Sequence, residues 1–254
     1  NSVSLTTNAT VTTSTFSPHR HGGYSAHFDG TGDWLYTVNQ NIPATSTYQV
    51  DGWFYAKDNT NVNIFSQGTS GNNRRTGLWI DNNGYIVFFI GSNGDSGGSG
   101  NNAASSWGNT TIPINQWTHF AATYNDPQME LFINGTSLGT ATSNDYAESN
   151  TPFYVGVFGY NTSLSFNGYM ADIRISDTVR NTSNFTPPTS PSVADSNTKL
   201  LLGRLPYLKD QSASNHTITV GGDASLKPFS LFDVGVYSEA SHGASAHFGE
   251  DNGG

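Results

Sequence analysis

The sequence predicts an all-β protein with the architecture of a two-sheet jelly-roll β-sandwich. The chain has 254 residues, of which 35% are hydrophobic and 13% aromatic, so a sizeable core is expected, while only 11% are charged. Short apolar runs alternate with Gly, Asn, Asp and Pro, as expected for short strands joined by turns. No stretch shows the sustained apolar period of about 3.6 residues that predicts a long helix.

The expected strands follow one another along the chain. Their residues are 25–28, 35–38, 48–55, 78–80, 85–90, 117–124, 129–133, the run from 136 onward, and 153–158. Asn134-Gly135 is the strongest hairpin signal, because both central residues of that turn take positive φ angles. Asp81 to Gly84 predicts a second hairpin turn. The tryptophans inside apolar runs are expected in the core, namely Trp53, Trp79 and Trp117.

Part of the sequence occurs twice. Ser25-Ala-His-Phe28 returns as Ser245-Ala-His-Phe248, and Phe16-Ser17 returns as Phe229-Ser230, at offsets of 213 to 220 residues. These echoes predict a repeated unit of about 215 residues. The expected organisation is a jelly roll over residues 1–190 with its core at 24–176. Residues 191–254 are expected either to complete this sandwich or to begin the next repeat.

The charge balance excludes some partners. The net charge is −9, and the ten Lys and Arg residues cluster only at Arg74 and Arg75. Nucleic acids are bound by clustered cations, so no nucleic-acid partner is expected. No apolar run approaches the roughly 18 residues that cross a bilayer, so membrane insertion is not expected either.

Five motifs occur in a recognisable order. They are Ser25 to Leu35, Val50 to Phe54, Trp117 to Phe120, Leu131 to Gly135 and Phe166 to Ile175. In this order they resemble the concanavalin A-like lectin/glucanase superfamily and its laminin-G-like domains, which implies a jelly roll. Residues 184–189, 198–202 and 210–220 are most similar to repeats of marine bacteriophage structural proteins. That resemblance implies a virion appendage or fibre.

Some members of this superfamily hydrolyse β-glucans, but the residues for that reaction are missing. A retaining glycosidase needs two carboxyl groups about 5 Å apart. The hydrolase pattern Glu-x-Asp-x-x-Glu is absent, and no acid lies within two residues of Glu130 or Glu148. Glu250 and Asp251 are adjacent and would point to opposite faces of a strand. The sequence therefore predicts a protein that is not an enzyme.

A structural calcium ion is a second expectation. The turn from Asp29 to Asp33 is rich in carboxylate and carbonyl oxygens, which calcium prefers, and its glycines let the carbonyls converge. The resemblance implies that an aspartate of the last core strand joins this turn, and Asp172 matches that position. The expected ligands are thus Asp29, Gly30 and Asp172. The alternative is that the aspartates only make turn hydrogen bonds.

Glycan binding is expected in loops that combine aromatic rings with polar side chains. The loops considered are 66–75, 91–108 and the one after the 153–158 strand, and their candidate residues are Asn73, Arg74, Arg75, Asp95, Trp107, Tyr160 and Asn161. Trp107 is the best single candidate, because exposing a tryptophan in a Gly/Ser/Asn loop is costly without a ligand. Its alternative is a core plug that folds back on the sheet.

The predicted function is a non-catalytic glycan-binding or adhesion module of a phage appendage or fibre. Its location would be the virion or the extracellular space, and its partners glycans or a host surface. One alternative is a structural spacer or assembly protein that binds copies of itself or other virion proteins. A further alternative is the carbohydrate-binding module of a secreted bacterial protein.

Overall fold

The computed structural model of the chain describes residues 11–14, 23–37, 45–68, 74–91, 103–143, 151–159, 161–205, 207–232 and 245–248. For residues 11–14, 74, 103–109, 162 and 245–248 it describes the backbone alone. Within these ranges the regular elements are β-strands, apart from a 3-10 turn η1 at Thr162–Leu164. The prediction of an all-β fold is confirmed. In the described part of the chain, no helix is long and apolar enough to cross a membrane.

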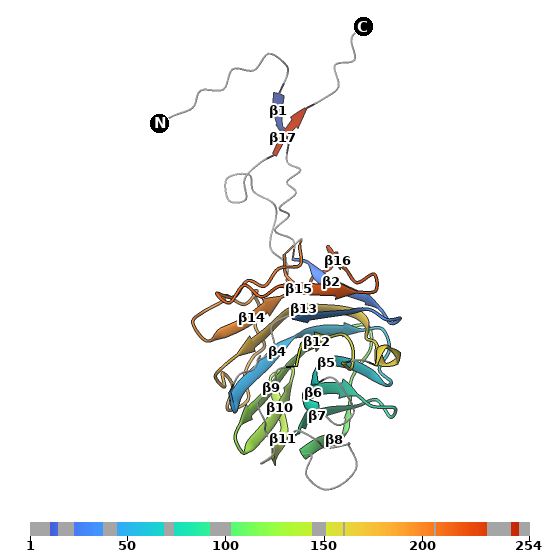
Figure 1. The fold of residues 1–254 in the computed structure, drawn as a ribbon, viewed down its shortest axis with the longest axis vertical. Coiled ribbons are helices and arrows are strands. Elements are labelled where there is room, and N and C mark those ends of the chain that lie inside the picture. Colours follow the sequence, from blue (N-terminus) through green and yellow to red (C-terminus); the bar gives the residue numbers. More distant parts are fainter. Residues whose placement is uncertain are drawn as a thin grey trace.

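Most strands form two antiparallel sheets stacked face to face (Figure 1). Among the described residues, the first sheet has eight strands in the order β11-β10-β9-β4-β13-β2-β16, with β14 also pairing with β13. The bounds of its strands are β2 (Ser25–Asp29), β4 (Thr47–Ala56), β9 (Trp117–Asn125), β10 (Gln128–Ile133), β11 (Thr136–Thr142), β13 (Asn167–Ser176), β14 (Thr198–Leu202) and β16 (Ser225–Lys227).

The second sheet follows the order β15-β3-β12-β5-β6-β7-β8, again among the described residues. The bounds of its strands are β3 (Trp34–Thr37), β5 (Val62–Gly68), β6 (Arg74–Ile80), β7 (Tyr85–Ile90), β8 (Ala103–Thr111), β12 (Phe153–Val155) and β15 (Ile218–Gly221). The remaining strands, β1 (Val11–Ser14) and β17 (Ser245–Phe248), pair with each other in a separate two-stranded sheet.

Strand alternation places the core between the sheets. In β4, Val50 and Phe54 are fully buried in the core cluster, while Asp51 and Tyr55 alternate with them on the outer face. Successive strand residues point to opposite faces, so each strand contributes every second side chain to the core. Aromatic rings of the two sheets meet inside the core, where Phe65 of β5 stacks on Phe120 of β9 at 6.0 Å.

The Asn134-Gly135 hairpin has the predicted geometry. Their φ angles are 48° and 76°, which confirms a turn with two positive φ values. Gly135 has a second role, because its carbonyl accepts a hydrogen bond from the backbone N–H of Phe185 at 2.9 Å. A Cβ atom at this position would collide with the Phe185 carbonyl. The turn therefore also anchors the segment that follows β13.

Strands after residue 197 extend both sheets. β14 pairs with β13, β15 pairs with β3, and β16 pairs with β2. The turn between β15 and β16 therefore lies beside the turn between β2 and β3. Residues nearly 200 positions apart in the sequence meet at this edge, where the backbone N–H of Asp223 donates to the Asp33 carboxylate at 2.8 Å.

The prediction that all three strand tryptophans lie in the core is wrong. Trp79 and Trp117 are partly exposed on the outer faces of their sheets. Trp53 is 9% exposed and buried, but it lies on the outer face of the first sheet against His119 and Phe232. Their strand neighbours Phe54, Leu78 and Thr118 are fully buried, so alternation turns the tryptophans outward.

Candidate functional site

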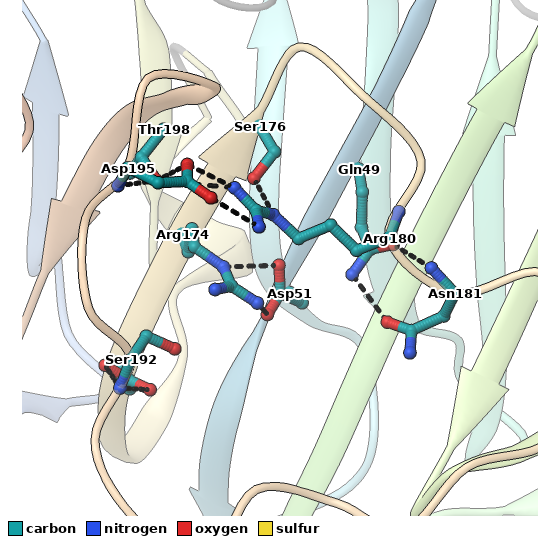
Figure 2. A network of polar contacts seen from close by, with 10 residues as sticks. Gln49, Asp51, Arg174, Ser176, Arg180, Asn181, Ser192, Asp195 and Thr198 are labelled. Atoms are coloured by element: carbon teal, nitrogen blue, oxygen red, sulfur yellow. Dashed lines mark hydrogen bonds and ion pairs between the residues drawn. The ribbon is translucent and has the colours of Figure 1, made fainter.

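The outer face of the first sheet is largely covered by the chain itself. Residues 177–197, between β13 and β14, cross this face and are held to it by polar contacts (Figure 2). Arg180 donates two hydrogen bonds to Asp195, at 2.9 and 2.7 Å, and its backbone N–H donates to the Gln49 side chain at 2.9 Å. Ser192 donates its backbone N–H to the buried Asp172 carboxylate at 2.9 and 3.1 Å.

A buried ion pair lies beneath this segment. The Arg174 guanidinium donates two hydrogen bonds to the Asp51 carboxylate, at 2.7 and 3.1 Å, and the two side chains are 14% and 3% exposed. Burial raises the pKa of the Asp51 carboxyl, and Arg174 opposes that rise. The neighbouring His119 is 2% exposed, and its burial, followed by the nearby Arg174 charge, lowers its pKa to about 4. His119 is therefore neutral at pH 7.

Phenylalanines that follow β16 cover another part of the same face. The Phe229 ring lies 5.5 Å from the Trp117 ring, 4.5 Å from Tyr169 and 5.1 Å from Tyr55. The Ser25 hydroxyl fixes this arrangement by donating to the Phe229 carbonyl. The aromatic rings of this cluster thus pack against one another, while Phe229 itself stays 36% exposed.

The outer face of the second sheet carries a pocket of about 130 Å³. Its lining comes from the start of β5, from β6 and from the segment around η1, and consists of Asn61, Val62, Asn63, Trp79, Phe158 and Leu164. The Trp79 side chain is partly exposed and lies 6.1 Å from the Phe89 ring of the next strand. Drug-sized ligands occupy pockets of roughly 300–1,000 Å³, so this one suits a single small ring.

One segment closes the far side of the pocket. Residues 156–159 and 161–164 line this side, and the Ser66 hydroxyl of β5 donates to the Val157 carbonyl and accepts from the Gly159 N–H. Gly156 begins the segment with a φ of 85°, and a Cβ atom there would meet the ring of the buried Phe28. These contacts bring Phe158 and Leu164 to the pocket that Trp79 lines.

The pocket combines apolar and amide groups without charge. Asn63 is 1% exposed, and with its amide nitrogen turned toward the backbone it donates to the carbonyls of Phe65 and Val157, at 2.9 and 3.2 Å. Asn61 is exposed, with a φ of 57°. None of the six lining side chains is acidic or basic. The site offers an aromatic ring and amide hydrogen bonds, but no group for acid–base catalysis.

A second aromatic group lies on the same outer face. The rings of Trp34 and Tyr36 of β3 lie 6.3 and 5.6 Å from the ring of Tyr154 of β12, and 5.1 Å from each other. All three side chains are partly exposed. Partial burial, and to a lesser extent the neighbouring Tyr36, raises the pKa of Tyr154. The second sheet therefore presents two partly exposed aromatic groups, of which the Trp79 group lines a pocket.

Two of the predicted loop placements are wrong. Arg74 and Arg75 begin strand β6, and Arg75 is 3% exposed, so it is not accessible to a surface ligand. Trp107 lies within strand β8, which pairs with β7 through an irregular register. Small polar residues suggested a loop there, although residues 103–106 and 111 on either side of the irregularity pair with β7. The side chains of Arg74 and Trp107 lie outside the described part of the structure.

The remaining predicted glycan residues have mixed outcomes. Asn161 precedes η1, and its side-chain oxygen accepts the Ser163 N–H at 3.1 Å, so it helps to form the segment that closes the pocket. Asn73, Asp95 and Tyr160 lie outside the described residues. Trp79 was predicted to lie in the core and not in a binding site. The signal for its exposure is strand alternation in Leu78-Trp-Ile80, which places the tryptophan on the face opposite its two neighbours.

The predicted calcium ligands do not come together. Asn167 of β13 is the residue opposite Asp29, and Asp172 lies five residues further along that strand, which is roughly 16 Å. Instead, carboxylate oxygens of Asp29, Asp33 and Asp223 lie within 4.8 Å of one another. Asp172 is not part of this group. Asp223 is, because β15 pairs with β3 and β16 pairs with β2, which brings the turn between β15 and β16 to the turn between β2 and β3.

The donor set at this edge has the chemistry of a calcium site. Asp33 is fully buried, and burial raises the pKa of its carboxyl. Its two oxygens accept the backbone N–H groups of Asp29 and Asp223, both at 2.8 Å. Asp29 and Asp223 are exposed and present further carboxylate oxygens, the ligand type that calcium takes. Calcium binding itself stays a prediction.

Comparison with known proteins identifies the family. A family model described as "Concanavalin A-like lectin/glucanases superfamily" matches residues 29–184, more than half of the chain. The chain belongs to this superfamily. Membership agrees with the stacked antiparallel sheets, and the predicted family is confirmed at this level. No curated protein sequence matches the chain.

Solved structures share the superfamily fold at low sequence identity. A SAP-like pentraxin from Limulus polyphemus is 16% identical, with a TM-score of 0.51, 81% of this chain covered and 96% of the pentraxin. Mouse laminin α1 domains LG4-5 are 18% identical, with a TM-score of 0.44 and coverages of 66% and 47%. Domain 4 of an arabinanase from Geobacillus stearothermophilus, in complex with arabinotriose, is 18% identical, with a TM-score of 0.44 and coverages of 67% and 77%.

Proposed function

We propose that this superfamily member is a non-catalytic glycan-binding module and that the Trp79 pocket is its binding site. The observation that supports this is the combination in one pocket of a partly exposed tryptophan ring with the amides of Asn61 and Asn63. Sugar rings have apolar faces that pack on aromatic rings and hydroxyl groups that hydrogen-bond to amides. The Trp79 side chain would pack against the ring, and the exposed Asn61 amide would hydrogen-bond to its hydroxyl groups, while the buried Asn63 holds the pocket wall in place.

The ligand class follows from the charge of the site. The six lining residues carry no cation, and the protein as a whole has a net charge of −9. A sialylated or sulfated glycan would therefore meet repulsion without a compensating ion pair. We expect neutral glycans, each bound through a single sugar residue.

The proposed context is adhesion by a virion or an extracellular assembly. The resemblance of residues 184–189, 198–202 and 210–220 to bacteriophage structural repeats supports the virion, as a fibre or appendage, while the secreted bacterial binding module is the alternative. In either setting one weak pocket becomes effective when many copies are presented together. Host-surface glycans are the proposed partners.

Glycan-array binding of the whole chain tests the proposal, followed by titration calorimetry of the best ligand. Trp79→Ala removes the packing surface and is expected to weaken binding by at least about tenfold, or ~1.4 kcal/mol. Trp117→Ala is the matched control, because this tryptophan is also partly exposed but lies on the other sheet under Phe229. Trp107→Ala tests the residue that the sequence favoured.

Two results contradict the proposed site. Unchanged affinity in Trp79→Ala, with normal unfolding behaviour, would exclude the pocket, and a loss confined to Trp107→Ala would move the site to β8. Binding restricted to sialylated or sulfated glycans would exclude the neutral ligand class. Absence of binding to any glycan would leave the structural spacer as the better account of the module.

A further inference from the structure

The repeated sequence motifs coincide with paired strands. Ser25-Ala-His-Phe28 forms most of β2, and its second copy forms β17. β16 ends two residues before Phe229, and β1 ends two residues before Phe16, the equivalent phenylalanine. By sequence, β17 is thus the equivalent of β2, and β1 occupies the place of β16. We call β2 and β16 the closing pair, because they join the first and last strands of the sandwich.

The separate two-stranded sheet has the register of the closing pair. In the closing pair, His27 is opposite Ser225 and Ala26 is opposite Leu226. β1 and β17 lie side by side (Figure 1), with His247 opposite Thr12 and Ala246 opposite Thr13. Thr12 lies four residues before Phe16, as Ser225 does before Phe229. Both pairs are antiparallel, so the β1–β17 pair is a second closing pair in strand identity, direction and register.

The order of the strands along the chain differs between the two pairs. In the sandwich, the β2 strand comes first and the β16 strand last. In the second pair the order is reversed, since the strand of β16 type precedes the sandwich and the strand of β2 type follows it. Each copy of the chain thus offers one strand of each type, on either side of its sandwich. In both pairs a strand of one type is hydrogen-bonded to a strand of the other type.

The second pair lacks the support that the first pair has. The closing pair continues into the first sheet through β13, whereas β1 and β17 pair with no third strand among the described residues. A two-stranded sheet of four residues per strand is marginally stable in water. Because the same ladder forms whether its strands belong to one copy or to two, exchange between copies keeps every backbone hydrogen bond.

We propose that β1 and β17 couple copies of this chain end to end, with β17 of one copy pairing with β1 of the next in the closing-pair register. Such a contact joins two different surfaces, so copies add head to tail into open chains or close into rings, of which a reciprocal pair of copies is the smallest. It presents the sandwiches in series. The inference stands on the strands alone and does not depend on glycan binding.

Disulfide trapping in the full chain tests this coupling, because the sequence contains no cysteine. Directly opposite residues in an antiparallel ladder have Cα atoms about 4.5–5.5 Å apart, within the range for a disulfide. Thr13→Cys and Ala246→Cys are placed in separate, differently tagged copies, mixed at high concentration and oxidised. Ala26→Cys with Leu226→Cys in one copy is the matched control, since these positions are equivalent in the closing pair. Thr12→Cys mixed with Ala246→Cys is the register control.

The expected product of the first mixture is a covalent dimer that contains both tags. The control pair in one copy is expected to cross-link only within that copy, and the Thr12→Cys mixture is expected to remain mostly uncross-linked. Sedimentation of the unmodified chain should show a mean mass that rises with concentration. Cross-linking of a Thr13→Cys/Ala246→Cys double variant only within single copies, with no mixed dimer, would overturn the coupling. Equal cross-linking from Thr12→Cys would overturn the shared register.

Discussion

Replacing His119 should reduce the loss of unfolding free energy that occurs as the pH falls from 7 to 4. His119 lies between Trp53 and Phe185, with ring centroids 4.9 and 5.5 Å away, and near the Arg174 charge. Its pKa falls from 6.5 when unfolded to about 4 when folded. Between these values the unfolded chain binds more protons, so stability decreases as the pH falls from 6.5 and the loss is complete below pH 4. At 1.36 kcal/mol per pKa unit, His119 lowers the free energy of unfolding by about 3 kcal/mol at pH 4 relative to pH 7.

Urea unfolding of the wild type and of His119→Phe, followed by tryptophan fluorescence at several pH values from 7 to 4, measures this cost. Phenylalanine keeps an aromatic ring between Trp53 and Phe185 but cannot take up a proton. Burial raises the pKa values of Asp51 and Asp172, and these groups favour the folded state at low pH in both proteins. The difference between the two curves therefore isolates His119. Parallel curves from pH 7 to pH 4 would refute the reasoning.

Three further predictions concern the ion pair, the pocket segment and the acidic cluster. Asp51→Asn leaves Arg174 buried without its partner and should cost about 3–5 kcal/mol in urea unfolding, whereas Asp195→Asn, at an exposed pair, should cost under about 1 kcal/mol. Equal costs would contradict the assigned burial. Gly156→Ala forces a Cβ atom against Phe28, so it should lower the free energy of unfolding by about 3 kcal/mol and weaken glycan binding. Gly32→Ala has a similar φ but open space around the Cβ atom, so it should lower the free energy of unfolding by only about 1 kcal/mol. Calcium at about 100 times its Kd should stabilise the wild type by about 2.7 kcal/mol, measured as a rise in Tm, and should leave the Tm of Asp223→Asn unchanged. A wild-type Tm that does not rise with calcium would contradict the calcium prediction.

Local signals in the sequence predicted many of the strands and turns, because those features depend on neighbouring residues, but β5 was not predicted and β8 was assigned to a loop. Asn134-Gly135 needs only its own backbone preferences to form a hairpin turn, and the structure confirms it. The alternation in β4 similarly predicts which side chains enter the core. Runs such as Leu78-Trp-Ile80 are apolar on both faces, so composition alone assigned Trp79 to the core, and only the stacking of the second sheet shows that it faces outward.

The candidate site depends on contacts between distant parts of the sequence, which local patterns do not report. The pocket needs β5, β6 and the segment after β12 to meet, and the acidic cluster needs the β15–β16 turn to reach Asp33. Trp107 shows the opposite failure. Its Gly, Ser and Asn neighbours have weak strand preferences, yet pairing with β7 makes the segment a strand, as tertiary context often does.

The position of β16 in the chain has a consequence for biosynthesis. The strand that covers the free edge of β2 leaves the ribosome about 200 residues after β2 itself. At typical rates of about 5–20 residues per second, the edge of β2 stays unpaired for ten seconds or more, roughly. An unpaired edge is a template for pairing with other chains, so nascent polypeptides on one polysome are the neighbours most exposed to mispairing.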